Sequence, residues 1–211
     1  MTKAVLKAES FAEQRAYAER VKALALKKYG KTPNACVITF GCQQNVSDSE
    51  KLKGQLSNMG YKITDNIEDA QFIIFNTCAV REHAEDRVYG NIGTTKALKK
   101  SNPDIIVAVC GCMAQRQSVA EKIRKSYPYV DMVFGTQAGF RLPEFIYKRL
   151  SGSKRVFDLT LDNGEIPEDI PVKRDGTFKG WLPVMYGCNN FCTYCIVPYV
   201  RGRERSRMPE K

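Results

Sequence analysis

The chain has 211 residues, of which 43% are hydrophobic and 27% are charged. This balance is typical of a folded protein with a packed core and excludes wholesale disorder. The longest strongly apolar run, residues 105–110, is far shorter than the roughly 20 residues that a membrane helix requires. Because the first residues also lack the apolar stretch of a secretory signal, we expect a cytoplasmic protein with no membrane partner.

The net charge of the chain is strongly positive, +10 with histidine neutral. Such a charge is compatible with a polyanionic partner, above all nucleic acid. It is equally compatible with a basic surface that is only solvated. The charge therefore permits a function on RNA without establishing one.

The cysteine content is unusual, because eight cysteines accompany a single histidine, His83. Disulfide frameworks are typical of small secreted domains, and this chain has neither their size nor an export signal. In a reducing compartment, clustered cysteines are more often metal or redox ligands. With one histidine available, a metal site must be dominated by thiolates, which predicts iron–sulfur clusters or cysteine-rich zinc.

Residues 10–29 have the pattern of an amphipathic helix. Ser10 and Glu13 have the spacing of a capping box, apolar residues then recur at helical intervals, and Gly30 supplies a stop. Basic side chains decorate this segment, either as a solvated face or as an extension that touches RNA. We therefore predict a helical extension over residues 1–32.

Residues 33–152 alternate between strand and helix patterns. Short apolar runs rich in β-branched residues predict strands at 35–40, 71–76, 105–110 and 130–134. Helical patterns follow at 47–59, 82–100, 114–125 and 143–150, with Ser47 and Glu50 as the expected cap of the first and Gly60 as its stop. This alternation is typical of βαβ units. The fold class we expect is α/β, an open parallel sheet with flanking helices.

The composition changes after residue 152. Residues 153–180 are predicted to be a connector rich in proline, glycine and aspartate, with one short strand expected at 155–160. An apolar run at 181–186 then leads into Cys188, and a barrel built on that strand would need on the order of 200 residues. We therefore expect the N-terminal part of a longer protein, in which residues 181–211 begin a second, incomplete domain.

Three cysteines lie just past the predicted strands: Cys42, Cys78 and Cys112. Parallel strands end at one edge of a sheet, where ligands bind in open α/β folds. Three thiolates converging there are able to hold a cubane cluster and leave one iron open. The alternative is three incidental cysteines at strand ends. Cys36 and Cys110 fall inside apolar runs, and we assign them to packing.

A second group lies on one loop, with the spacing C-x3-C-x2-C: Cys188, Cys192 and Cys195. Such close spacing allows three thiolates to cap three corners of a cubane, leaving the fourth iron open to chelate an amino acid. A zinc knuckle and a thioredoxin-like pair are the alternatives. Zinc lacks an obvious fourth local ligand, and a thioredoxin-like pair at Cys192 and Cys195 does not require Cys188.

These motifs resemble the radical S-adenosylmethionine methylthiotransferase family. TFGCQQN at 39–45, NTCAVRE at 76–82 and GCMAQ at 111–115 are similar to motifs of its N-terminal domain, and GCNNFCTYC at 187–195 is similar to its cluster loop. The resemblance covers residues 33–211. Within the family, AVREH at 79–83 is typical of the members that modify prenylated adenosine in tRNA.

The resemblance implies cofactors and roles for individual residues. Cys188, Cys192 and Cys195 would bind a [4Fe–4S] cluster that chelates S-adenosylmethionine, with Tyr194 beside its adenine. The strand-end cysteines 42, 78 and 112 would bind an auxiliary [4Fe–4S] cluster that carries or supplies sulfur. The loop would then follow the first strand of a truncated radical S-adenosylmethionine barrel.

The resemblance also implies a reaction and partners. One S-adenosylmethionine would donate a methyl group to sulfur, and a second would generate a radical that removes hydrogen from carbon 2 of isopentenyl-adenosine next to the anticodon in tRNA. Reduced flavodoxin or ferredoxin would donate the electron, and the protein would act as a monomer. We expect the 211-residue chain alone to be inactive, because it lacks most of the barrel.

Two other functions remain open at this stage. The first is the same chemistry on threonylcarbamoyl-adenosine in tRNA or on a ribosomal protein. The second belongs to another class, a non-catalytic cysteine-rich module that binds metal or RNA.

Two groups of charged residues flank the cysteines. Residues 201, 203, 205 and 207 are arginines, for which phosphate contact, a structural role near the cofactor and simple solvation are alternatives. Arg81, Glu82 and His83 follow Cys78 and would either tune a cluster from outside its ligands or be ordinary helix residues.

Overall fold

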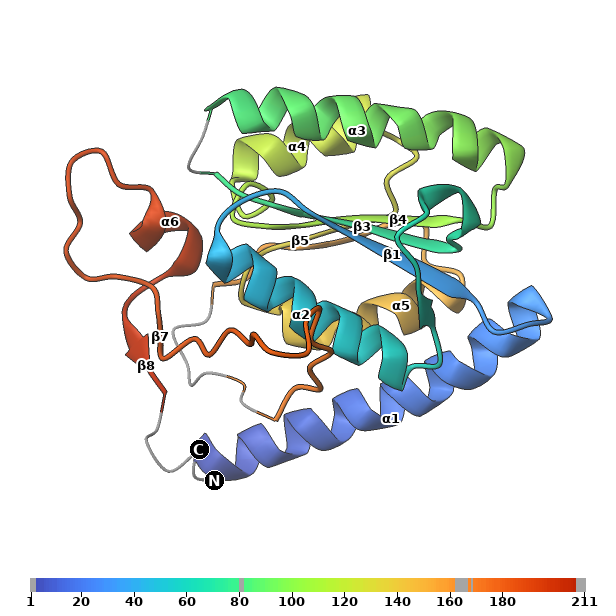
Figure 1. The fold of residues 1–211 in the computed structure, drawn as a ribbon, viewed down its shortest axis with the longest axis horizontal. Coiled ribbons are helices and arrows are strands. Elements are labelled where there is room, and N and C mark those ends of the chain that lie inside the picture. Colours follow the sequence, from blue (N-terminus) through green and yellow to red (C-terminus); the bar gives the residue numbers. More distant parts are fainter. Residues whose placement is uncertain (1–2, 80–81, 162–166, 168, 208–211) are drawn as a thin grey trace.

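Six parallel strands form the central sheet of the protein (Figure 1), which we describe from a computed structural model covering residues 3–79, 82–161, 167 and 169–207. The strands lie side by side in the order β2-β1-β3-β4-β5-β6. The expected α/β fold with a parallel sheet is therefore confirmed. The strand bounds are β1 Asn34–Thr39, β2 Lys62–Ile63, β3 Phe72–Thr77, β4 Ile106–Gly111, β5 Met132–Phe134 and β6 Val156–Asp158.

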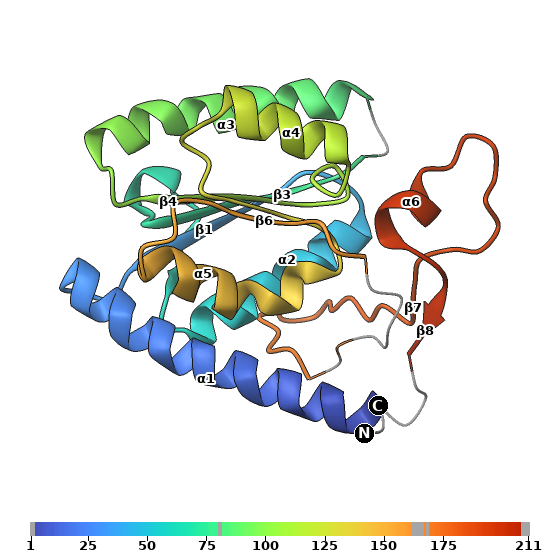
Figure 2. The same ribbon diagram turned by 180° about the vertical axis from the view of Figure 1, so that it is seen from behind.

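Helices cover both faces of the sheet, as Figures 1 and 2 show from opposite sides. One face carries α1, α2 and α5, and the other carries α3 and α4. None of the helices in the described ranges is long and apolar enough to cross a membrane. The helix bounds are α1 Lys3–Tyr29, α2 Gln43–Asn58, α3 Glu82–Ser101, α4 Gln117–Ser126 and α5 Leu142–Leu150.

The core lies in two layers because side chains alternate along each strand. On β3, Phe72 and Ile74 pack in the cluster that includes α1, α2 and α5. Ile73 and Phe75 point the other way, into the cluster under α3 and α4. All four side chains are fully buried, as expected for a central parallel strand covered on both faces.

The helix starts differ from those that the sequence patterns predict. α2 begins at Gln43 with Cys42 as its N-cap, so Ser47 and Glu50 are buried inside the helix and do not cap it. α1 begins at Lys3, so Ser10 lies within the helix and the expected capping box is wrong. α4 begins at Gln117, three residues later than predicted. A capping pattern is a local signal, and packing against the sheet overrides it here.

The segment after β6 forms little regular structure. The strand expected at 155–160 is confirmed as β6, whereas most of the apolar run at 181–186 is not strand. Only its end, β7 Met185–Tyr186, pairs antiparallel with β8 Arg205–Ser206. Between them lies the short helix α6, Val197–Arg201, at the edge of the sheet where β1, β3 and β4 end (Figures 1 and 2).

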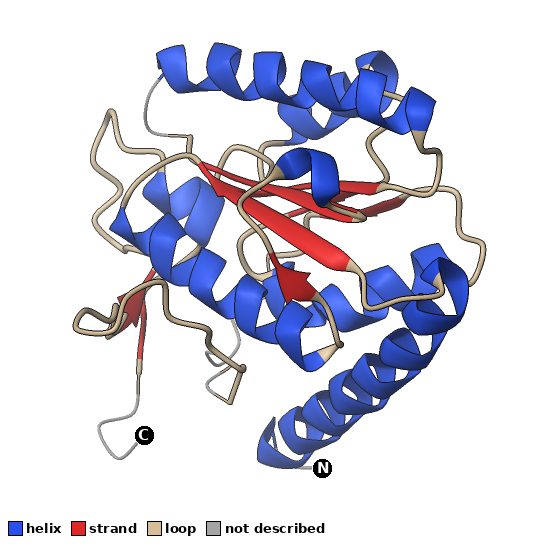
Figure 3. Cartoon of the chain, turned by 45° about the vertical axis from the view of Figure 1, so that its right-hand side comes forward, coloured by secondary structure: helices blue, strands red, loops and turns tan. Residues whose placement is uncertain are grey.

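The connector is fastened along α2 (Figure 3). The backbone N–H of Lys173 donates to the Glu50 carbonyl at 2.9 Å, and Arg174 Nη1 donates to Glu50 Oε2 at 2.6 Å. Gly54 permits the close approach, because a Cβ there would lie 2.1 Å from the Pro171 carbonyl oxygen. Glu50, predicted as a helix cap, is instead the buried carboxylate that holds the connector.

The two-layer core leads to a stability prediction. Replacing the fully buried Phe75 by alanine leaves a cavity, and we expect it to lower the free energy of unfolding by about 3–5 kcal/mol. Phe178 is 99% exposed, so Phe178→Ala is expected to change it by less than about 0.5 kcal/mol. Urea denaturation followed by circular dichroism measures both. Equal effects of the two substitutions would contradict the described core.

Candidate metal centre

Three of the eight cysteines lie at one edge of the sheet. Cys42 follows β1, Cys78 follows β3 and Cys112 follows β4, and these three strands are neighbours. Cys78 and Cys112 are buried, and Cys42 is exposed. The parallel register thus brings together residues that are more than thirty positions apart in sequence, as the strand-end pattern predicts.

This edge contains the point where the chain changes direction across the sheet. β1 connects through α2 to β2 on one side, and β3 connects through α3 to β4 on the other. The two helices cover opposite faces. Connections that diverge in this way leave a crevice at the carboxyl ends of the two strands, where open α/β sheets bind ligands. Cys42 and Cys78 follow these two strands.

Glycines bring the cysteine turns close to the end of β3. Gly41, with φ of 148°, packs so tightly that an added Cβ would lie 2.6 Å from the Cβ of Cys78. Gly111, with φ of 94°, would place a Cβ only 2.3 Å from the Thr77 carbonyl oxygen. Both conformations favour glycine. Cys42 and Cys112, which follow these glycines, are thereby drawn toward Cys78.

A buried amide network lies beneath the cysteines. Asn45 Nδ2 donates to Asn76 Oδ1 and to the Thr77 carbonyl, each at 3.1 Å. Asn76 Nδ2 donates in return to the Asn45 carbonyl at 2.8 Å. Cys42 Sγ donates to Asn45 Oδ1 at 3.3 Å. The network therefore ties the first turn of α2 to the end of β3 and fixes Cys42 relative to Cys78.

Burial keeps the innermost thiols protonated in the metal-free chain. It raises the pKa of Cys112 to about 11, an effect that the Arg201 guanidinium partly offsets. It raises the pKa of Cys110 well above the ordinary value for a thiol, and Asp48 adds to the increase. Cys110 and Cys36 both lie in the apolar core, in agreement with their predicted packing role.

Arg201 reaches this edge from a distant part of the chain. Its Nε donates to Cys112 Sγ at 3.1 Å, and its Nη2 donates to Asp48 Oδ2 at 2.8 Å. Only 8% of the residue is exposed. For the four arginines at 201–207, simple solvation was one alternative, and for Arg201 this prediction is wrong because the residue is buried. Arg203, Arg205 and Arg207 also make contacts within the protein.

The second cysteine group lies on the loop that precedes α6. Cys188 and Cys195 are half-buried and Cys192 is exposed. The N–H of Cys188 donates to the Gly202 carbonyl at 3.2 Å, and the N–H of Cys195 donates to the Cys192 carbonyl at 2.9 Å. Tyr194 is 94% exposed. Backbone hydrogen bonds thus hold the loop at Cys188 and Cys195, and the Tyr194 side chain projects into solvent.

All eight cysteines are free thiols. In the ranges that the structure describes, no three His, Cys, Asp or Glu side chains are grouped closely enough to bind one metal ion. The arrangement therefore does not match a mononuclear zinc site. In a cubane cluster each thiolate binds a different iron, so the ligands are spaced more widely. Three free thiols at one sheet edge have the ligand chemistry that such a cluster requires.

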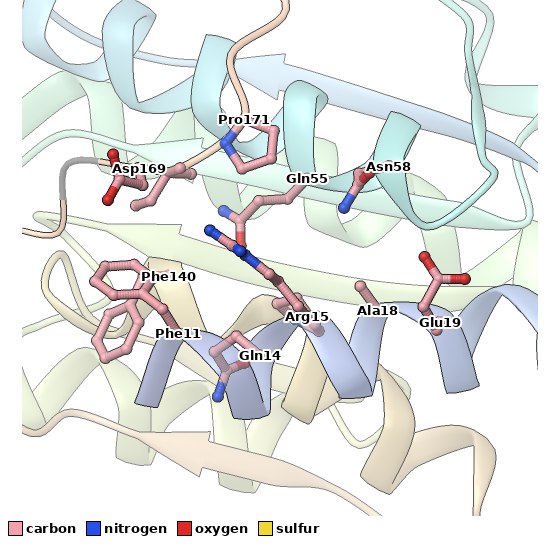
Figure 4. A pocket seen from close by; sticks show the side chains of 12 residues that line it. Phe11, Gln14, Arg15, Ala18, Glu19, Gln55, Asn58, Phe140, Asp169 and Pro171 are labelled. Carbon is pink, nitrogen blue, oxygen red and sulfur yellow. The ribbon is translucent and has the colours of Figure 1, made fainter. Parts of the chain in front are cut away.

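A cavity of about 420 Å³ lies elsewhere, between α1, α2 and the connector (Figure 4). Arg15, Glu19, Gln55 and Asp169 line it together with apolar side chains. Phe11 and Phe140 close one end, with ring centroids 6.3 Å apart. No cysteine lines this cavity, so it is separate from both thiol groups.

The sequence is similar to those of known proteins. The sequence profile of a family described as "Uncharacterized protein family UPF0004" matches residues 34–135, which include the three strand-end cysteines. The chain is 50% identical over 204 residues to the tRNA-2-methylthio-N(6)-dimethylallyladenosine synthase of Caldicellulosiruptor saccharolyticus, covering 95% of this chain and 43% of that protein. It is 48% identical over 202 residues to the synthase of that name from Acetivibrio thermocellus, covering 94% and 42%.

The resemblance to the methylthiotransferase family is confirmed. The chain spans about two fifths of the length of these methylthiotransferase relatives. The profile match covers the sheet and its strand-end cysteines, whereas the longer alignments extend over nearly all of this chain.

Sequence reasoning missed the polar residues at the sheet edge that carries Cys42, Cys78 and Cys112. Asn45 and Asp48 follow Cys42 within the first turns of α2, and Asn76 is the last but one residue of β3. Asn76 could have been predicted, because a polar residue at the carboxyl end of an otherwise apolar strand indicates a specific hydrogen-bonding or ligand-binding role. Arg81 lies outside the described residues, and only the helical backbone of Glu82 and His83 is described, so their proposed tuning role stays a prediction.

The amide network leads to a second prediction. Asn45→Ala removes the donor to the Thr77 carbonyl and leaves it buried without that partner, so we expect the free energy of unfolding to fall by about 1–3 kcal/mol. Asn91 is an exposed asparagine that bonds the Arg87 carbonyl at 2.7 Å, and Asn91→Ala should cost less than about 0.5 kcal/mol. Urea denaturation of both variants measures the difference. A cost for Asn45→Ala no larger than for Asn91→Ala would refute the structural role of the network.

Proposed function

We propose that the full-length protein is a radical S-adenosylmethionine methylthiotransferase that adds a methylthio group to carbon 2 of isopentenyl-adenosine next to the anticodon in tRNA. The observation that carries this proposal is the placement of Cys42, Cys78 and Cys112 at one sheet edge, where α6, the helix that follows the second triad, docks through Arg201. The names of the relatives support the substrate. Because the chain spans about two fifths of those relatives, the activity is proposed for the whole protein.

The two triads take different parts in the proposal. Cys42, Cys78 and Cys112 would hold the auxiliary [4Fe–4S] cluster, and Cys188, Cys192 and Cys195 would hold the one that chelates S-adenosylmethionine. When bound, these cofactors supply the one-electron chemistry and the sulfur that acid–base side chains lack. The described edge fits this division, because the auxiliary thiols are largely buried while the loop of the second triad is accessible.

Other groups of the protein would position the cysteines and shield the two cluster sites from water. The burial of Cys78 and Cys112 would exclude water from the auxiliary site, and the bonds from Asn45 to Asn76 and to the Thr77 carbonyl would hold the turn that carries Cys42 in place. The backbone bonds of Cys188 and Cys195 would hold their loop in a fixed conformation. Tyr194, exposed and close to Cys195 in the loop, is available to lie beside the adenine of S-adenosylmethionine.

The partners and domains follow from the same proposal. The charge of +10 would help to attract the phosphates of tRNA. Reduced flavodoxin or ferredoxin would supply electrons to a monomeric enzyme. We assign residues 1–32 to a helical extension, 33–152 to the methylthiotransferase domain, 153–180 to the connector and 181–211 to the start of the barrel domain. The exposure of Leu182 and Val184, each 64%, supports packing against further protein at that point.

Iron analysis tests the division of the cysteines. After anaerobic reconstitution, the full-length protein should bind about eight irons, because two cubanes contain about four each. The triple variant Cys188→Ala, Cys192→Ala, Cys195→Ala should retain about four. The triple variant at Cys42, Cys78 and Cys112 should also retain about four. Iron and acid-labile sulfide are measured on all three proteins.

The control uses a cysteine that packs in the core. Cys36 is buried under α3 and α4, and Cys36→Ala should leave the iron content at about eight. Complete loss of iron from the Cys188, Cys192 and Cys195 variant would refute an independent auxiliary site. Zinc in place of iron would instead favour the non-catalytic metal-binding module.

Nucleoside analysis tests the substrate. In cells that lack the gene, 2-methylthio-N6-isopentenyl-adenosine should disappear from tRNA while unthiolated isopentenyl-adenosine accumulates, because the proposed step acts on the prenylated base. Mass spectrometry of digested tRNA measures both, and complementation with the intact gene is the control. Persistence of the methylthio nucleoside would refute this substrate, and loss of the threonylcarbamoyl-adenosine derivative instead would select the related enzyme class.

A further inference from the structure

One side chain joins the two cysteine groups. Arg201 lies at the end of α6, six positions after Cys195, yet its guanidinium donates to Cys112 Sγ at 3.1 Å. Its Nη2 donates to Asp48 Oδ2 on α2 at 2.8 Å. Asp48 Oδ1 accepts from Gln44 Nε2 at 3.1 Å, so the carboxylate is itself held in place. The guanidinium is therefore fixed from two directions.

The backbone around Arg201 is held by the end of β5. Thr136 Oγ1 donates to the Val200 carbonyl at 2.7 Å, and Gln137 Nε2 donates to the Arg201 carbonyl at 3.0 Å. Val200 and Arg201 are both buried. These bonds fasten α6 to the sheet independently of the guanidinium. The direction in which the side chain points is thus set by the backbone.

The same turn anchors the second cysteine group. The residue after Arg201 is Gly202, whose carbonyl accepts from the N–H of Cys188 at 3.2 Å. Gly187 packs so closely there that an added Cβ would lie 2.5 Å from the Gly202 carbonyl oxygen. Two consecutive residues therefore contact one cysteine of each triad, Cys112 through a side chain and Cys188 through the backbone.

The charge of the guanidinium is balanced within the protein. An arginine side chain stays protonated in proteins, and the Asp48 carboxylate lies 2.8 Å from Arg201 Nη2. Asp48 supplies the compensating carboxylate, so a buried cation remains next to a cysteine that the proposed function assigns to a cluster. Such a cation is able to donate a hydrogen bond to a thiolate without first acquiring a proton.

We propose that Arg201 is a positioning residue that donates a hydrogen bond to the Cys112 thiolate of the auxiliary cluster and thereby raises the reduction potential of that cluster. This inference rests on the proposed function. Reduction adds negative charge to a cluster and its thiolates, so a cationic donor stabilises the reduced form more than the oxidised form. Because Arg201 directly precedes the residue that anchors Cys188, it also keeps the two triads in a defined relation.

The potential of the auxiliary cluster tests the inference. Full-length protein with Cys188, Cys192 and Cys195 changed to alanine carries a single cluster if the proposed function is right. In this background, Arg201→Gln should shift the reduction potential to a more negative value and alter the electron paramagnetic resonance spectrum of the reduced cluster. Arg201→Lys, which keeps the charge but not the planar donor fork, should shift the potential in the same direction by less.

The matched control is Lys125→Gln, which removes one positive charge from the exposed last turn of α4, away from the cysteines. It should leave both the potential and the spectrum unchanged. Potentials for both Arg201 variants equal to that of the control would overturn the inference. Absence of iron from the background protein would instead overturn the auxiliary site itself, so the two failures are distinguishable.

A variant that loses its cluster still decides the question. If Arg201→Gln binds no iron but keeps the circular dichroism of the parent, Arg201 is needed at the thiolate and the positioning role is supported. Arg201→Lys then reports the direction of the potential shift, and a potential equal to the control overturns the inference. Unfolding of both variants would assign Arg201 to general stability and would also overturn it.

Discussion

The parallel pairing of β1, β3 and β4 is the constraint on which the candidate site depends. Parallel strands end at the same edge, so a residue just beyond each of three neighbouring strands is brought to one place. The direction of chain travel changes between β1 and β3, and open α/β sheets bind ligands at such a position. Close backbone packing at Gly41 and Gly111 draws the turns that carry Cys42 and Cys112 toward the end of β3. An antiparallel neighbour would have carried one cysteine to the opposite edge.

α2 links this edge to the rest of the chain. Its N-terminus carries Cys42, and its first turns contribute Asn45 to the amide network and Asp48 to the contact with Arg201. Further along, its buried Glu50 holds the connector. A single helix therefore positions Cys42, the connector and the segment that follows the second triad. A shift of α2 would therefore move Cys42, the connector and the segment that follows the second triad together.

The two triads differ in burial, although Cys42 of the first triad is exposed. Cys78 and Cys112 lie within the packed edge, where protein groups replace water, whereas Cys192 and Tyr194 lie on an accessible loop. A cluster that stores sulfur benefits from exclusion of water and oxygen. A site that binds a small diffusible cofactor requires access. The proposed roles agree with this physical difference, and Arg201 spans the boundary between the two environments.

The sequence by itself determined the strand and helix alternation, the parallel sheet and the grouping of cysteines, because these follow from local periodicity and from motif spacing. The start of α2 at Gln43, the burial of Glu50 and the contact between Arg201 and Cys112 were decided only by the tertiary structure. Capping signals act over a few residues, and packing of α2 against the sheet outweighs them. A contact across 89 positions depends on how α6 docks, which no local pattern encodes.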